Sequence, residues 1–84
     1  MSRIVKLKGD EVTGATTLGA ANTLGNATLV KVYHTAAFTV TVTDSANTQL
    51  GNTTFEAGSH FVAKSATDKI FTTAGLFTSV GYAD

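Results

Sequence analysis

The sequence has no cysteine, proline or tryptophan, and its charges cancel. Without cysteine the chain can form neither disulfides nor thiolate metal sites. Two histidines are too few to predict a metal site, so we expect no metal and no cofactor. Six basic residues balance six acidic ones, and such a chain is not expected to bind nucleic acid or an acidic membrane. No apolar run approaches the roughly 20 residues that a membrane span requires.

The length of 84 residues allows one domain, 1–84, and no second core. A chain this short buries about two-thirds or less of the surface that its unfolded form exposes, so its core is marginal. Small domains usually add a disulfide, a metal or a partner subunit. Since the composition favours partner subunits, we expect a homo-oligomer or a lattice-bound chain. Residues 1–6 are charged and lack the apolar core of a signal peptide, so we expect synthesis in a cytoplasm without export by this segment.

Threonine and glycine set the expected secondary structure. Threonine is β-branched and packs well on a pleated sheet. In the segment 37–43, AFTVTVT, apolar and polar residues alternate strictly, which predicts a half-buried strand of an antiparallel sheet. Its expected inward face holds Phe38, Val40 and Val42, and its expected exposed or interface face holds Thr39, Thr41 and Thr43.

Similar patterns predict further strands at 28–35, 49–55, 59–65, 70–73 and 76–83, the last broken at Gly81. We expect the strands at 28–35 and 37–43 to pair through a tight connection at Thr35-Ala36. The segment 9–27 is expected to be an extended strand followed by a glycine- and threonine-rich loop. The expected core is Val30, Val32, Phe38, Val40, Phe55, Phe61, Ile70, Phe71, Leu76 and Val80.

Turn signals at intervals of about 8–12 residues separate these short strands. The pattern predicts an all-β fold, a small antiparallel β-sandwich (Ig-like or jelly-roll-like) or a barrel-like domain, with about six to eight strands.

Catalytic residues are not predicted. Serine, threonine, histidine and aspartate all occur, but no local pattern typical of an activated nucleophile surrounds them. His34 and His60 are interpreted as residues on strand faces rather than as a base or a zinc ligand. The chain is therefore expected not to be an enzyme.

Two groups of residues are candidates for an interface. Arg3, Lys6 and Lys8 form a basic cluster that could meet an acidic neighbour, although lysines also protect a solvated strand edge from aggregation. The threonine row at 39, 41 and 43 is the second group. Such rows resemble the ice-binding faces of some antifreeze proteins, but one strand supplies only one rank, which favours an ordinary exposed strand face.

Residues 28–83 resemble a loose group of small bacteriophage proteins, many of them from marine and cyanobacterial phages. The resemblance lies in the strand LVKVYHT, the threonine–valine strand, the segment AGSHFVAKSATD, the segment IFTTAG and the ending VGYA. These occupy Leu29–Thr35, Ala37–Thr43, Ala57–Asp68, Ile70–Gly75 and Val80–Ala83. Residues 9–27 lie outside it.

This resemblance implies a virion structural protein located in the virion. Its partners would be the major capsid protein or other virion proteins, with no membrane and no nucleic acid. A capsid decoration (cement) subunit is the leading expectation, and a tail or neck accessory is the alternative within the virion. A carbohydrate-binding β module outside viruses is the remaining alternative. It would be expected to show an exposed aromatic platform, yet the sequence has no tryptophan.

Overall fold

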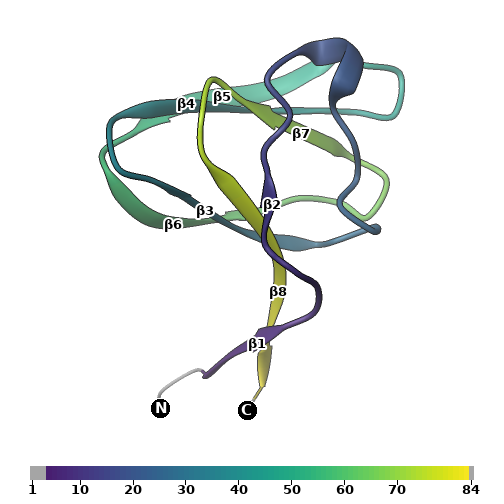
Figure 1. The fold of residues 1–84 in the computed structure, drawn as a ribbon. Helices are drawn as coiled ribbons and strands as arrows, with labels where there is room; N and C mark the ends of the chain where they lie inside the picture. Colours follow the sequence, from purple (N-terminus) through teal and green to yellow (C-terminus); the bar gives the residue numbers. More distant parts are fainter. Residues whose placement is uncertain (1–3, 84) are drawn as a thin grey trace.

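The computed structural model describes residues 4–83, which form two antiparallel β-sheets packed face to face (Figure 1). The larger sheet has the order β1-β8-β3-β6, with β2 also paired to β8. Its strands are β1 (Ile4–Leu7), β2 (Val12–Thr13), β3 (Leu29–His34), β6 (Gly58–Ala63) and β8 (Leu76–Ala83). The smaller sheet has the order β5-β4-β7, with β4 (Phe38–Thr43), β5 (Gln49–Phe55) and β7 (Lys69–Thr72). The predicted all-β sandwich is confirmed, and the sheets do not close into a barrel.

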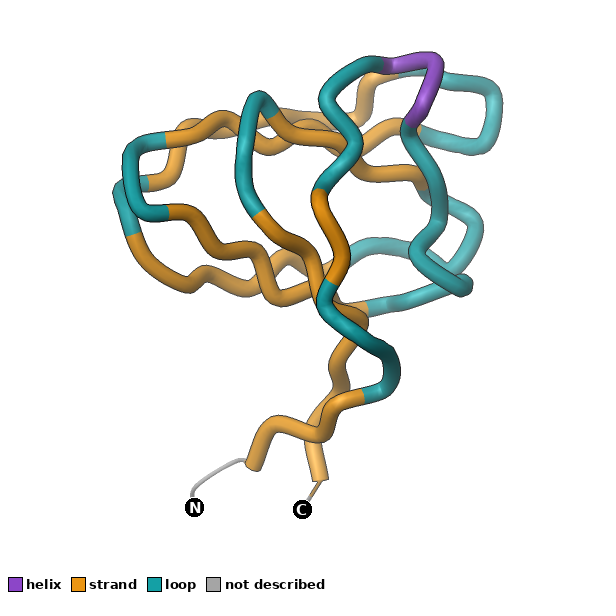
Figure 2. The backbone as a smooth tube through the Cα atoms, viewed as in Figure 1, coloured by secondary structure: helices purple, strands orange, loops and turns teal. Residues whose placement is uncertain are grey.

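The helical content of the described residues is one 3-10 turn, η1 (Leu18–Ala20), drawn purple in Figure 2. The strands fall close to the predicted segments, because alternation and turn residues are local signals. Asp44 illustrates this: its carboxylate accepts hydrogen bonds from the Ala46 and Thr48 amides, both at 2.9 Å, and closes the turn between β4 and β5. The predicted break at Gly81 is absent, and β8 runs through it.

The pairing of β3 with β4 was predicted wrongly. β3 pairs with β6 and β8 in the larger sheet, whereas β4 pairs with β5 and β7 in the smaller one. The short connection between His34 and Phe38 therefore crosses from one sheet to the other instead of closing a hairpin. Both segments bury apolar residues in the space between the sheets, and this arrangement lets them do so from opposite sides.

The core lies between the two sheets. β3 contributes Val30 and Val32, each 0% exposed, and β8 contributes Phe77. The smaller sheet supplies the facing residues Phe38, Val40 and Ile70. Six of the predicted core residues are buried, namely Val30, Val32, Phe38, Val40, Ile70 and Val80.

Four predicted core residues are not fully buried. Phe55, Phe71 and Leu76 are half-buried, and Phe61 is 43% exposed. The prediction for Phe61 was wrong because β6 turns the alternate residues, His60 and Val62, toward the other sheet.

The threonine row of β4 was also predicted wrongly in part. Phe38 and Val40 face the core as expected, but Thr41 and Thr43 are 6% and 1% exposed. The register is not inverted. Thr41 lies between Asn52 and Phe71 on the neighbouring strands, and Thr43 lies between Gln49 and Lys69, so longer side chains flank the short threonines.

Within the segment 9–27, β2 pairs with β8, and residues 15–22 run along the outer edge of β7. The Thr72 amide donates to the Ala15 carbonyl at 2.8 Å, and the Ile70 amide donates to the Asn22 carbonyl at 3.0 Å. Gly14 is needed in this segment, since a Cβ there would lie 2.6 Å from the Thr72 methyl. The expected loop is thus held by backbone hydrogen bonds, which cover an edge that would otherwise be open to another strand.

Candidate functional site: an apolar outer face

The outer faces of the two sheets differ in polarity. Strand alternation sends side chains of equal parity to the same face, and cross-strand partners share that face. Because Val40 faces the core, its neighbours Thr39 and Thr41 point outward, together with their partners on β5 and β7. The outer face of the smaller sheet is therefore mostly polar, with Thr39, Thr41, Thr43, Asn52, Thr54, Lys69 and Phe71.

The outer face of the larger sheet is mostly apolar. Val30, Val32 and Phe77 face the core. The opposite surface of the sheet is therefore formed by the alternate residues of β3, β6 and β8, together with the β1 residues that pair with β8 on that side. We call this surface the apolar face. It comprises Val5, Leu7, Leu29, Lys31, Tyr33, Ser59, Phe61, Ala63 and Leu76. Thr78 and Val80 point to the same side of the sheet but are buried.

Several large side chains of the apolar face remain open to solvent. Leu7 is 70% exposed, Phe61 43% and Val5 37%. Leu29 and Tyr33, which flank Lys31 along β3, are half-buried. A sheet face that is exposed to water normally carries polar side chains, because the residues of each strand alternate between an apolar inner face and a polar outer face. A contiguous apolar surface of this kind is typical of a site that another molecule covers.

The apolar face continues onto a two-stranded ribbon formed by β1 and the end of β8. This ribbon extends away from the body of the sandwich (Figure 1). The Lys8 amide donates to the Ser79 carbonyl at 2.9 Å. By the alternation of an antiparallel ladder, the backbone groups of Val5 and Leu7 then point away from β8. Among the described strands none pairs with this outer edge of β1. The edge is available for a further strand.

The structure separates the two predicted groups of interface residues. Lys6 is an exposed residue of the ribbon, and Lys8 packs its side chain over Gly81. Arg3 lies outside the described residues. The threonines of β4 lie on the outer face of the other sheet, where the Thr39 hydroxyl hydrogen-bonds that of Thr54 at 3.0 Å. The six residues therefore do not form one surface, and burial of Thr41 and Thr43 leaves them little area for contact.

Sequence reasoning missed most of the apolar face. The strand at 29–34 carries apolar residues on both sides, with Leu29 and Tyr33 opposite Val30 and Val32. That double-sided pattern was visible in the sequence and indicates a strand covered on both faces. Phe61 gave no such signal, because either face of β6 could have been the inner one.

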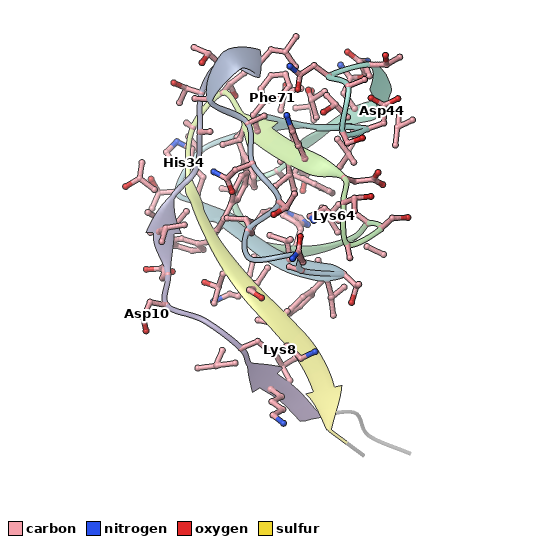
Figure 3. The ribbon with its side chains drawn as sticks, turned by 90° about the vertical axis from the view of Figure 1, so that its right-hand side faces the viewer. Lys8, Asp10, His34, Asp44, Lys64 and Phe71 are labelled. Carbon is pink, nitrogen blue, oxygen red and sulfur yellow. The ribbon has the colours of Figure 1, made fainter. Side chains whose placement is uncertain are left out.

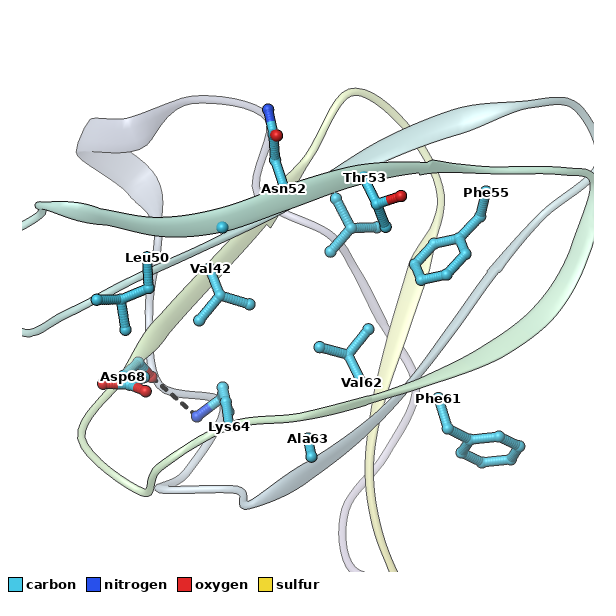
Figure 4. A pocket seen from close by; sticks show the side chains of 12 residues that line it. Val42, Leu50, Asn52, Thr53, Phe55, Phe61, Val62, Ala63, Lys64 and Asp68 are labelled. Carbon is cyan, nitrogen blue, oxygen red and sulfur yellow. Dashed lines mark hydrogen bonds between the residues drawn. The ribbon is translucent and has the colours of Figure 1, made fainter.

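Apart from the apolar face, a cleft opens between the edge strands β5 and β6 (Figure 4). This cleft has a volume of about 420 Å³, and its walls include Val42, Leu50, Phe55 and Val62. Phe61 also borders it, but its ring points away from the opening in Figure 4. The volume of the cleft is in the range of small-ligand pockets, but the polar groups at one end of the cleft already form hydrogen bonds within the protein.

Those polar groups belong to Lys64, labelled in Figures 3 and 4, and to Asp68, labelled in Figure 4. Lys64 is 8% exposed, and its ammonium donates to the Ala27 carbonyl at 2.6 Å, the Asp68 carbonyl at 2.8 Å and the Thr23 carbonyl at 2.9 Å. Burial lowers the pKa of Lys64, an effect that the nearby Asp68 carboxylate partly opposes. This cation joins the segment 23–27 to the turn 64–68, and its three N–H donors are all used in hydrogen bonds within the protein.

The two histidines belong to an aromatic cluster at one end of the sandwich. The His60 ring stacks on Phe55 with centroids 4.4 Å apart, and its Nε2 lies 2.8 Å from the Glu56 carbonyl oxygen. The His34 ring meets the Phe38 ring edge to face at 5.9 Å. Within residues 4–83 no group of three or more histidine or acidic side chains is arranged to hold a metal ion.

None of the helical residues in the described part of the chain forms a segment that could cross a membrane. Comparison with protein-family models, curated proteins and solved structures gives no match to this chain.

Proposed function

We propose that this chain is a structural subunit of a virus particle, a capsid decoration (cement) protein that docks on the major capsid protein lattice through its apolar face. The observation that carries this proposal is the contrast between the two outer faces. One presents polar side chains such as Asn52 and Thr54 to solvent, and the other exposes Leu7, Phe61 and Val5. A domain with one exposed apolar face is suited to binding another protein surface. The resemblance of residues 28–83 to small phage proteins supports a virus particle as the source of that surface.

A lattice would also offset the marginal stability of a small domain. Any partner that binds the folded chain and not the unfolded one stabilises the fold by mass action. The exposed edge of β1 gives such a partner backbone groups to pair with, in addition to apolar side chains. Net charge near zero makes the contact mainly apolar and hydrogen-bonded, so it should depend only weakly on salt.

The test is occupancy of purified particles, measured by quantitative mass spectrometry. Phe61→Asp removes a large apolar side chain from the apolar face and places a charge there, and it should reduce occupancy by about tenfold or more. Thr54→Asp places the same charge on the exposed polar face and should leave occupancy unchanged. Thermal melts of both variants control for folding.

A deletion of residues 1–10 provides a second arm of the test. It removes Val5, Leu7 and the free edge of β1 and should impair assembly more than folding. Full occupancy by the deletion variant and by Phe61→Asp, or absence of the wild-type chain from particles, would rule the proposal out. Immunolabelling at the tail or neck would favour the accessory alternative, and binding to cell-surface glycans without particles would favour the carbohydrate-binding module.

A further inference from the structure

Lys31 is the charged side chain of the apolar face, among the residues that the structure describes. It lies in the middle of β3, the strand between β6 and β8. Its cross-strand neighbours are Phe61 and Thr78, and Leu29 and Tyr33 flank it along the strand. All four are uncharged. Its ammonium lies 6.0 Å from the centre of the Tyr33 ring.

This placement decides what can cover the face. Burying an ammonium without a counter-charge is strongly unfavourable, whereas a facing carboxylate offsets much of that penalty. A second copy packed face to face with the two-fold axis near the middle of β3 would bring two Lys31 side chains together. Like charges juxtaposed in an interface are strongly unfavourable.

We propose that Lys31 makes the apolar face selective: it keeps copies of this chain from pairing and favours a protein surface that is apolar and carries one carboxylate opposite it. The inference rests on the proposed docking role of this face and specifies the chemistry of the partner. Leu7, Phe61 and Tyr33 supply the apolar contact, and Lys31 supplies the discrimination between partners.

The chain itself provides the probe. In Lys31→Glu the same apolar face carries a carboxylate at the matching position, so this variant stands in for the partner. Sedimentation velocity would compare wild type, Lys31→Glu and their equimolar mixture at equal total concentration. The mixture should form a heterodimer with an apparent dissociation constant at least about tenfold lower than either chain has alone. Raising the salt concentration should narrow that difference.

Two further variants locate the contact and guard against misfolding. Adding Phe61→Asp to the Lys31→Glu chain should abolish the heterodimer, because it disrupts the face without restoring the lysine. Lys31→Leu removes the repulsion and should self-associate, whereas wild type should stay monomeric. Thermal melts confirm that each variant is folded.

Wild type that self-associates as tightly as the mixture would overturn the inference, as would a Lys31→Leu chain that stays monomeric. These outcomes are independent of particle occupancy. A heterodimer formed by a chain that never appears on particles would refute the proposed function and leave the selectivity of the face standing.

Discussion

Replacing Lys64 by methionine removes the buried cation and keeps a side chain of similar length. In the wild type, the ammonium joins the carbonyl of Ala27, just before β3, to that of Asp68, just before β7, and to that of Thr23. The Lys64 side chain thus ties the segment 23–27 to the end of β6. Methionine would fill the space of the stem and leave these carbonyls without their donor.

The size of the effect follows from two opposing terms. Hydrogen bonds from a charged donor contribute about 1.5–3 kcal/mol each. Removing the ammonium also removes its desolvation cost, which is several kcal/mol for a buried ion. The bond to Ala27 is buried, whereas the other carbonyls are partly exposed and can turn to water. We expect a net loss of about 2–3 kcal/mol in the free energy of unfolding, or a melting temperature about 10–20 °C lower.

Urea unfolding followed by circular dichroism would measure this loss. The matched control is Lys69→Met, which removes an ammonium that makes one exposed hydrogen bond to Asn47. A surface change of that kind should alter the free energy of unfolding by no more than about 0.5 kcal/mol. If Lys64→Met proves no more destabilising than Lys69→Met, the inference that Lys64 stabilises the segment 23–27 is refuted.

Two further predictions concern pH and the core. Burial lowers the pKa of Lys64 below its ordinary value of 10.5, so the unfolded chain binds more protons than the folded chain between the lowered pKa and 10.5. The free energy of unfolding of the wild type should therefore rise with pH across that window relative to that of Lys64→Met. Urea unfolding at several pH values measures both free energies, and a wild-type advantage that falls as the pH rises would contradict this prediction. Phe38→Ala should cost about 3–5 kcal/mol, comparable to the whole stability of a small domain. Phe71→Ala, at a half-buried outward position, should cost clearly less in the same assay, and an unchanged Phe38→Ala variant would show that Phe38 is not a core residue.

The strands were predictable because their signals are local. β5 and β8 coincide with the predicted segments, and β3 and β4 differ from them by a residue or two. Alternation along a strand requires no knowledge of its neighbours. For β4 it also identified Phe38 and Val40 as core residues.

Much of the candidate site was not predictable in this way. A solvated strand edge was one interpretation of Lys6 and Lys8 from the sequence, and β1 does lie at the edge of its sheet among the described strands. The sequence does not show that Phe61 shares a surface with Leu7, because that contact surface is built from four strands far apart in the chain. Nor does it show that Lys64 is buried, since a lysine at the end of a strand is ordinarily solvated.

The sequence by itself determined that the chain is all-β, the positions of the strands from β3 to β8 to within about two residues, and that β4 turns Phe38 and Val40 to one side. Only the tertiary structure decided that β3 and β4 lie in different sheets and that His60 and Val62, rather than Phe61, face the other sheet. The physical reason is that a two-residue period defines two faces of a strand without saying which is inner. That choice depends on pairings between distant segments, which place Lys31 outward in an apolar surface and Lys64 inward among backbone carbonyls.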